Sequence, residues 1–224
     1  MNLTTLGGTK EFWDTFAPWY EKWLTRGHYH QSIIKDLAQM IEPGWHVLDI
    51  GAGTGALSIP MAALGCKVTA LEPSEGMRRI FSEKLKSLSV KNVTILPERW
   101  EDFVLPQNTK YDLIMASNSL HLTEGGLIRA MNKVFSFLPA YVCLITEINQ
   151  GISIDFKEMD MIQKDFSFLY IKKHTLDSTF YFEDMFEVKD FSHYLGRSIR
   201  VILEGEKPIQ NDKTDLAIVW WERK

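Results

Sequence analysis

The chain has 224 residues, of which 45% are hydrophobic and 24% charged, and its net charge is −4 at pH 7. This length and composition fit one globular domain with a full core, and they exclude a disordered chain or a continuous apolar membrane span. Because a mildly acidic protein does not attract phosphate backbones, we expect no nucleic acid and no membrane among its partners. Residues 1–10 carry neither a basic nor an apolar signal region, which predicts a cytoplasmic protein.

The first predicted element is a helix with an aromatic stripe. Large side chains recur there at helical spacing, and Pro18 should kink the helix or start a new one. We expect residues 1–44 to form a helical lid over a ligand site. The stripe consists of Phe12, Trp13, Phe16, Trp19, Tyr20, Trp23 and Leu24.

From Trp45 onward, short runs of β-branched or apolar residues alternate with amphipathic segments. This alternation is typical of βα units that build a mostly parallel sheet. Between the second and third runs, Ser74 is the expected N-cap of a crossover helix that carries Met77 and Phe81. The predicted strands are His46–Ile50, Lys67–Leu71, Asn92–Leu96, Tyr111–Ala116, Tyr141–Ile148, Ser198–Leu203 and Leu216–Trp221.

The end of the chain predicts a change of strand direction. The connection from Glu204 to Asp215 is too short for a helical crossover, so the last two predicted strands should pair as an antiparallel hairpin. The segment before them, residues 151–195, is longer than a simple crossover and rich in Phe, Tyr and Met. We expect it to be an insertion that covers the ligand site together with the lid. The pattern predicts an α/β fold in one domain, residues 1–224.

The most informative stretch is a glycine-rich turn after the first predicted strand. Gly51, Gly53 and Gly55, with Ala52 among them, stand where the strand gives way to a helix. Glycines let the backbone turn sharply and approach a nucleotide-like ligand, which the free amides at the helix start then face. Glu72 ends the next predicted strand, roughly 20 residues later, where a carboxylate can accept both hydroxyls of a ribose.

The turn alone leaves two kinds of ligand open. Gly51, Gly53 and Ala56 also satisfy the dinucleotide pattern G-x-G-x-x-G/A, so an NAD-dependent oxidoreductase is an alternative. Asp49 favours another ligand, because a carboxylate just before the turn opposes a pyrophosphate. The same carboxylate suits a ligand that carries an ammonium group and a sulfonium but no phosphate.

The run Val47–Ala56, followed by Glu72, Pro73, Ser74 and Met77, resembles the class I S-adenosylmethionine-dependent methyltransferase family. The likeness extends over most of the chain. It implies a Rossmann-like three-layer sandwich whose seven-stranded, mostly parallel sheet ends in an antiparallel strand. It also implies S-adenosylmethionine as the cofactor, with Asp49 and the glycine turn at its methionine half, Glu72 at its ribose and Met77 near its adenine.

The same resemblance implies two further contact segments. Family members usually place an acidic residue at the adenine amino group after the third strand; here Glu98 or a later carboxylate could serve, with Arg99 and Trp100 flanking the base. Ser117 and Asn118 follow the fourth predicted strand, where the family meets the sulfonium and the acceptor. This stretch lacks the Asn/Asp-Pro-Pro-aromatic motif of enzymes that methylate amino groups of bases or glutamine, which argues against those substrates.

Methyl transfer from a sulfonium is an in-line displacement for which positioning alone can suffice. If the acceptor requires a base, His121 is the best candidate, although it could also pack or cap beside the cofactor. Tyr20 could close over the carboxylate of the cofactor or simply pack within its helix. His28 and His30 suggest a metal pair at first sight, but their i and i+2 spacing does not put two ligands on one helical face. We therefore assign no metal.

The prediction is an enzyme that transfers a methyl group from S-adenosylmethionine to a small molecule. Both covers are rich in aromatic rings, which suggests an acceptor with an apolar or planar surface, although core packing explains the rings as well. An NAD-dependent oxidoreductase and a domain that binds the cofactor without catalysis are the alternatives.

Overall fold

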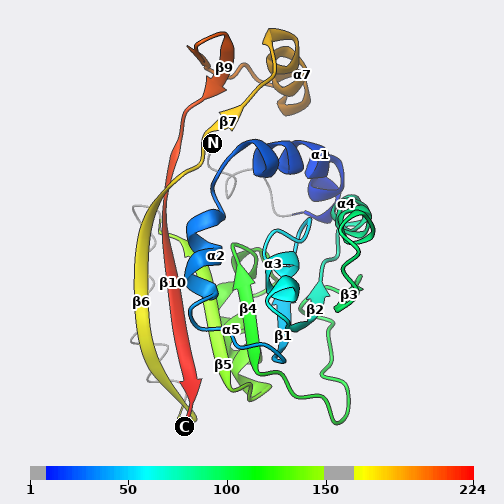
Figure 1. Cartoon of the computed structure of the whole chain (residues 1–224), viewed down its shortest axis with the longest axis vertical. Helices are drawn as coiled ribbons and strands as arrows, with labels where there is room; N and C mark the ends of the chain where they lie inside the picture. Colours follow the sequence, from blue (N-terminus) through cyan, green and yellow to red (C-terminus); the bar gives the residue numbers. More distant parts are fainter. Residues whose placement is uncertain (1–8, 149–163) are drawn as a thin grey trace.

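A computed structural model describes residues 9–148 and 164–224. Its centre is a mixed seven-stranded sheet with the order β3-β2-β1-β4-β5-β10-β6. The first five strands in this order run parallel, and β10 is antiparallel to both of its neighbours (Figure 1). This arrangement confirms the predicted fold class. The strands are β1 (His46–Ile50), β2 (Lys67–Leu71), β3 (Val93–Leu96), β4 (Leu113–Ser117), β5 (Tyr141–Glu147), β6 (Phe166–Asp177) and β10 (Lys213–Arg223).

The central strands are apolar because both faces of the sheet are covered. Alternate side chains of β1 enter different cores: Val47 packs in the cluster that includes Ile33 and Met61, and Leu48 packs in the cluster that includes Val134. Within the described residues, no helix is both long and apolar enough to cross a membrane. The helices are α1 (Lys10–Arg26), α2 (Gln31–Leu37), α3 (Ser58–Ala63), α4 (Glu75–Ser87), α5 (Gly126–Ser136) and α7 (Met185–Leu195).

Helix α1 lies across the carboxyl ends of the parallel strands, beside the start of α4 (Figure 1). It is one uninterrupted helix that includes Pro18, so the proline does not begin a new one. Asp14 Oδ1 accepts hydrogen bonds from Ser74 Oγ at 2.7 Å and from the Gly76 amide at 3.2 Å. A Cβ atom on Gly76 would lie 2.2 Å from the Asp14 carbonyl oxygen. The two helices therefore meet backbone against backbone, and α1 is fixed to the framework.

The predicted terminal hairpin is wrong in its pairing. The antiparallel partners of β10 are β5 and β6, not Ser198–Leu203. That stretch leads instead into β8 (Ile202–Glu204), which pairs with β9 (Lys207–Gln210) across a tight turn where Gly205 has φ 62°. The chain therefore reverses at Gly205, within the segment from Glu204 to Asp215 that the prediction treats as a single connection. β9 also pairs with β7 (Phe180–Tyr181), which completes a separate three-stranded sheet.

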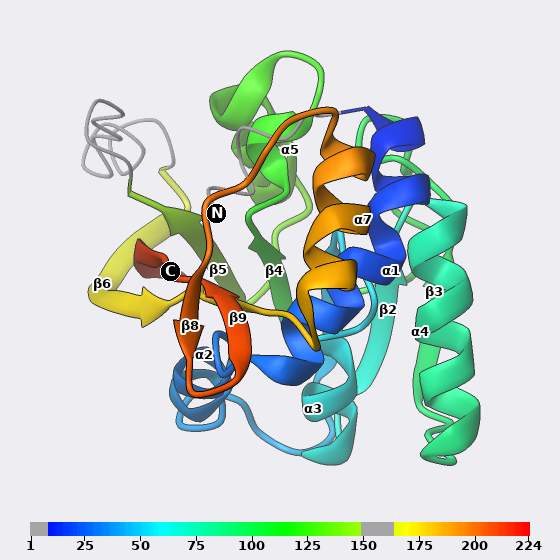
Figure 2. The same cartoon turned by 90° about the horizontal axis from the view of Figure 1, so that it is seen from above.

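The predicted cover, residues 151–195, lies partly outside the described residues, since 149–163 are not among them. Its described part contains β6, β7 and α7. Helix α7 packs on the outer side of α1, where the rings of Trp19 and Phe191 lie 4.8 Å apart (Figure 2). Glu187 on α7 also accepts a hydrogen bond from Arg26 Nη1 at 2.6 Å. This part of the predicted cover therefore supports the lid from outside.

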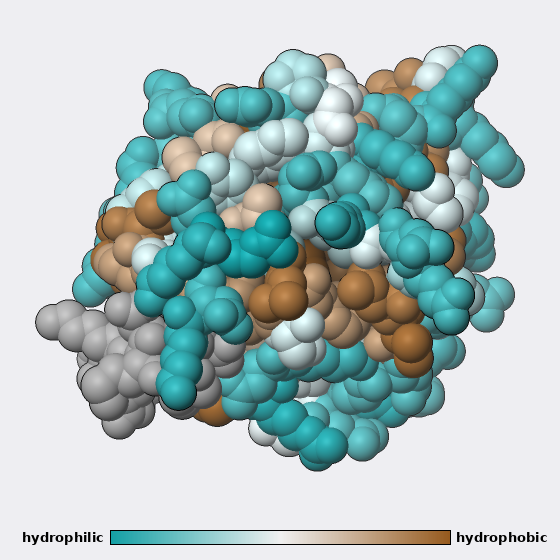
Figure 3. All heavy atoms as spheres, turned by 90° about the horizontal axis from the view of Figure 1, so that it is seen from below, coloured by the Kyte–Doolittle hydropathy of each residue, from teal (hydrophilic) through white to brown (hydrophobic). Residues whose placement is uncertain are grey.

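The end of the molecule opposite α1 is drawn in Figure 3. Its surface is mostly hydrophilic, with apolar side chains gathered in smaller areas. The parallel strands begin at this end, whereas ligands of open α/β sheets bind at the carboxyl ends. The fold therefore directs attention to the space beneath α1.

Candidate functional site

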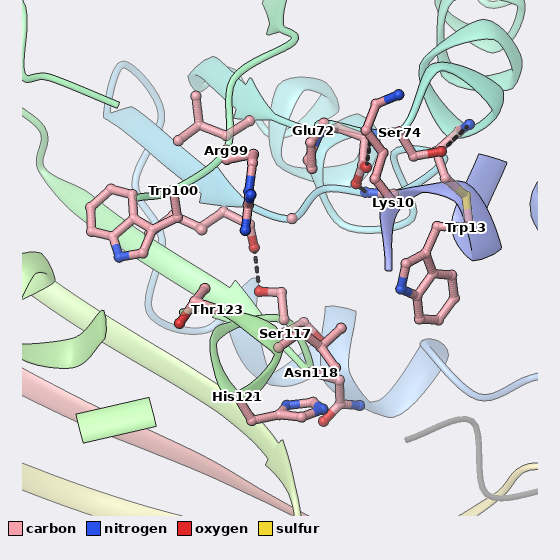
Figure 4. A pocket seen from close by; sticks show the side chains of 18 of the residues that line it. Lys10, Trp13, Glu72, Ser74, Arg99, Trp100, Ser117, Asn118, His121 and Thr123 are labelled. Atoms are coloured by element: carbon pink, nitrogen blue, oxygen red, sulfur yellow. Dashed lines mark hydrogen bonds between the residues drawn. The ribbon is translucent and has the colours of Figure 1, made fainter. Parts of the chain in front are cut away.

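A cavity of about 480 Å³ lies beneath α1 at the carboxyl ends of β1, β2 and β4. Its volume falls in the range of roughly 300 to 1,000 Å³ that is usual for small-molecule sites. β1 has β2 on one side and β4 on the other, so the chain order reverses here and the cavity opens at the topological switch point. In Figure 4, Arg99 and Trp100 lie on one side of the cavity and Lys10 and Trp13 lie across it.

The glycine turn after β1 forms the floor of the cavity. Gly51 has φ 72°, and a Cβ atom there would lie 2.4 Å from Cβ of Ser119, so the loop after β4 excludes any side chain. Gly53 has φ 57°, but a Cβ atom there would meet Tyr20 Cε1 only at 3.6 Å. Gly51 is therefore required by packing, whereas Gly53 leaves room on the side of the cavity.

Backbone hydrogen bonds hold both carboxylate oxygens of Glu72. Its Oε2 accepts a hydrogen bond from the Gly53 amide and its Oε1 accepts one from the Ser74 amide, each at 2.8 Å. The residue is only 6% exposed, and this burial raises the pKa of its carboxyl to about 7. Each carboxylate oxygen can accept more than one hydrogen bond, so both remain able to receive the hydroxyls of a ribose. The residues present fit an adenosyl ligand.

Three predicted cofactor residues do not line the cavity. Asp49 is 2% exposed, and its Oδ2 accepts a hydrogen bond from Ser58 Oγ at 2.6 Å behind the turn. Burial raises the pKa of Asp49 to about 6. A Cβ atom on Gly55 would clash with the ring of Phe81 at 2.2 Å, so this glycine serves the packing of α4, and Ala52 is buried as well. Any effect of Asp49 on a ligand acts through its charge across the turn.

The side of the cavity beyond β2 and β3 contains residues that the family resemblance assigns to the cofactor, most of them to its adenine. Pro73, Met77, Glu98, Arg99 and Trp100 all line it. The indole of Trp100 is anchored in the core, since its Nε1 donates to the Ala130 carbonyl oxygen at 3.3 Å. The Arg99 guanidinium contacts two carboxylates, Glu101 at 3.4 Å and Glu124 at 3.2 Å. Arg99 therefore holds its own loop to the loop before α5.

Ser117, Asn118 and His121 line the cavity where β4 ends. The side chain of Asn118 is a bridge: its Nδ2 donates to the Tyr29 hydroxyl at 3.3 Å, and its Oδ1 accepts from the Glu147 amide at 2.9 Å. His121 lies on the short 3-10 helix η2 (Leu120–Leu122). His121 is exposed at the mouth of the cavity, and partial desolvation lowers the pKa of its imidazole, which favours the neutral form.

The structure brings several residues to the cavity that sequence reasoning did not assign. Tyr20 lines it as predicted, but so do Trp23, Tyr29, His30 and Glu147. The stripe on α1 signals Trp23, and the end of a predicted strand signals Glu147. Nothing in the sequence indicates that the turn after α1 folds back over the site. Within the described residues, no group of three or more His, Cys, Asp or Glu side chains could hold a metal ion.

Comparison with known proteins agrees with this geometry. Residues 47–139 match the family model described as a methyltransferase domain. An uncharacterized methyltransferase of Anoxybacillus flavithermus is 26% identical over 175 residues, which cover 66% of this chain and 80% of the relative. The ribosomal protein L11 methyltransferase of Campylobacter concisus is 30% identical over 156 residues, which cover 60% of this chain and 55% of the relative.

A solved structure shares the fold. Magnesium protoporphyrin IX methyltransferase of Synechocystis, determined with S-adenosylmethionine bound, superimposes with a TM-score of 0.55 at 19% identity. The superposition covers 85% of this chain and 79% of that one. The matched domain begins at β1 and contains the glycine turn and Glu72, which carry the sequence resemblance. The chain therefore contains a methyltransferase domain and has the fold of the class I S-adenosylmethionine-dependent methyltransferases, and it is an enzyme with S-adenosylmethionine as its cofactor.

Proposed function

We propose that this enzyme transfers the methyl group of S-adenosylmethionine to a small molecule held in the cavity beneath α1. Helix α1, which forms the roof of the cavity, is the observation that supports this proposal. Asp14 fixes the start of α1 to α4, and Glu21 forms an ion pair with Lys84 of α4 at 2.8 Å further along. An acceptor enclosed under a helix that is tied down in this way must be small.

The residues of the chain divide the cavity into parts suited to the parts of the cofactor. Glu72 would accept the ribose hydroxyls, while Met77 and Glu98 lie on the adenine side. Gly51 and Gly53 would lie at the methionine side, where their lack of side chains lets the cofactor approach the backbone; their amides donate to the Leu71 carbonyl oxygen and to Glu72. Burial raises the pKa of Tyr20, so its phenol stays protonated and can donate a hydrogen bond to the carboxylate of the cofactor.

When bound, the cofactor supplies a methyl group that is already activated by its sulfonium. The contribution of the chain is then mainly orientation, which is worth roughly 7 to 11 kcal/mol in well-aligned reactions. For a hydroxyl acceptor, the proton that the hydroxyl loses would pass to the neutral imidazole of His121. A base of this kind typically adds about 10²- to 10⁴-fold in rate.

The acceptor class can be tested with labelled cofactor. Wild-type protein is incubated with methyl-labelled S-adenosylmethionine and with cell extract separated by ultrafiltration into a low-molecular-weight and a macromolecular fraction. We expect label to transfer into the small molecules. Transfer only into protein or RNA would contradict the proposal, and it would align this chain with relatives such as the ribosomal protein methyltransferase. The Gly53→Val variant is the control, because its side chain would occupy the space left for the cofactor.

A further inference from the structure

One side of the cavity is a continuous aromatic wall, of which only Tyr20 is assigned to the cofactor. The ring centroids of Trp23 and Tyr29 lie 4.8 Å apart, and those of Tyr29 and His30 lie 4.9 Å apart. All three residues line the cavity. Tyr20 continues the wall on α1, with its ring 5.6 Å from that of Trp23. Such a surface suits a planar apolar ligand, and the faces of Trp and Tyr also attract cations.

A carboxylate stands at the end of this wall. Asn118 joins the Tyr29 hydroxyl to the backbone of Glu147, so the end of β5 lies directly beside the wall. Glu147 lines the cavity and is only 9% exposed. Burial raises the pKa of the Tyr29 phenol, and the negative charge of nearby Glu147 raises it further. Aromatic rings next to a buried carboxylate form a favourable environment for an ammonium group.

The charges that line the cavity favour a cationic acceptor over an anionic one. Five carboxylates line it, and the two basic side chains among the described lining residues, Lys10 and Arg99, already form ion pairs with Asp14 and with Glu101 and Glu124. An anionic acceptor would therefore find no unpaired cation among the described lining residues.

His30, the histidine in the aromatic wall, adds no positive charge to the cavity. Burial lowers the pKa of His30 to about 4, so its ring is neutral and does not repel a cation. Its Nδ1 is buried and has no hydrogen-bond partner among the described residues. A buried nitrogen without a partner is costly, so its retention beside the cavity is consistent with a role in ligand binding.

We propose that Trp23, Tyr29, His30 and Glu147 form the acceptor subsite, and that they bind an arylalkylamine with its planar ring on the wall and its ammonium group toward Glu147. This proposal rests on the proposed function, since it names the acceptor class of the same cavity. The two ligands then use different carboxylates: Glu72 serves the cofactor and Glu147 serves the acceptor.

The test compares three probes that share one ring system but differ in charge. Tryptamine, 3-methylindole and indole-3-propionate are titrated calorimetrically into protein saturated with S-adenosylhomocysteine. We expect tryptamine to bind about tenfold or more tightly than the neutral probe, as a charge-assisted hydrogen bond predicts, and the carboxylate to bind weakest. Equal binding of the three probes, or tightest binding of the carboxylate, would overturn the assignment.

Two variants test whether the charge that binds the ammonium group is that of Glu147. Glu147→Gln should reduce the affinity for tryptamine about tenfold or more, while the affinity for S-adenosylhomocysteine stays within about twofold. Glu11→Gln removes the same charge from an exposed lining position on α1 and should leave tryptamine binding unchanged. If S-adenosylhomocysteine itself fails to bind to the wild type, the proposed function fails. If it binds and the preference for the amine is absent, only the subsite fails. If Glu147→Gln does not fold, the comparison of the three probes on the wild-type protein still tests the proposed subsite.

Discussion

Replacing Glu72 by glutamine should both weaken cofactor binding and remove its dependence on pH. In the folded protein the carboxylate accepts one backbone amide at each oxygen, Gly53 and Ser74, both at 2.8 Å. A glutamine side chain has only one oxygen, so its amide group would face one of these N–H donors. An unsatisfied buried donor costs about 1 to 3 kcal/mol, although part of this cost is offset because the variant no longer buries a charge.

The size of the pH effect follows from the carboxyl of Glu72, whose pKa burial raises to about 7. Hydroxyl donors stabilise the ionised form, so binding is favoured when the proton leaves and the affinity must rise with pH. With a pKa of about 7, roughly one molecule in eleven is ionised at pH 6 and ten in eleven at pH 8. The wild type should therefore bind S-adenosylhomocysteine roughly tenfold more tightly at pH 8 than at pH 6.

Isothermal titration calorimetry at pH 6, 7 and 8 measures both effects. At pH 7, repeating the titration in two buffers with different ionisation heats should reveal proton release from the wild type and none from Glu72→Gln. Glu83→Gln, which removes a charge from the exposed face of α4, is the matched control and should behave as the wild type. A glutamine variant that keeps the slope, or a wild type without one, would refute the assignment of this carboxylate to the ribose.

Three further predictions follow from the same contacts. Gly51→Ala should lower the free energy of unfolding by about 1 to 3 kcal/mol more than Gly53→Ala, since both glycines have positive φ but only Gly51 faces Ser119 at 2.4 Å; urea unfolding of the two variants measures the difference. Asp14→Ala should weaken S-adenosylhomocysteine binding about fivefold or more, because α1 loses its hydrogen bonds to α4, and an unchanged affinity with a native circular dichroism spectrum would contradict this role of the roof. Asp49, whose pKa is raised to about 6 in the folded protein, holds its proton more firmly there than when unfolded, so it stabilises the fold below about pH 4 and loses this contribution as the pH rises through about 6. The stability of the ligand-free wild type should therefore fall relative to Asp49→Asn across this range, and a relative rise would show the opposite sign.

The parts of the fold that were predicted well depend on local signals. β1 and β2 have the predicted bounds, because buried parallel strands appear as short apolar runs. The cap of α4 was equally readable, and Ser74 Oγ accepts the Met77 amide at 3.2 Å. Glu72 could be identified because the end of a parallel strand fixes where its last side chain goes.

The parts that were missed depend on tertiary contacts. β6 is an edge strand whose exposed and buried residues follow no regular alternation, and the register of its pairing with β10 shifts between Trp220 and Trp221. Tyr29 and His30 belong to the turn between α1 and α2, so their place beside Asn118 results from the packing of α1. A single sequence gives no sign of such a long-range contact.

Ser74 has a consequence for the order of events in a catalytic cycle. Its amide donates to Glu72, and its hydroxyl donates to Asp14 while accepting from Met77. Ser74 thus connects Glu72, at the expected ribose position, with helix α1 over the cavity. A coupling between two binding events is reciprocal. Binding of the cofactor and docking of α1 on α4 should therefore stabilise each other. The acceptor then enters a cavity that cofactor binding has already made rigid.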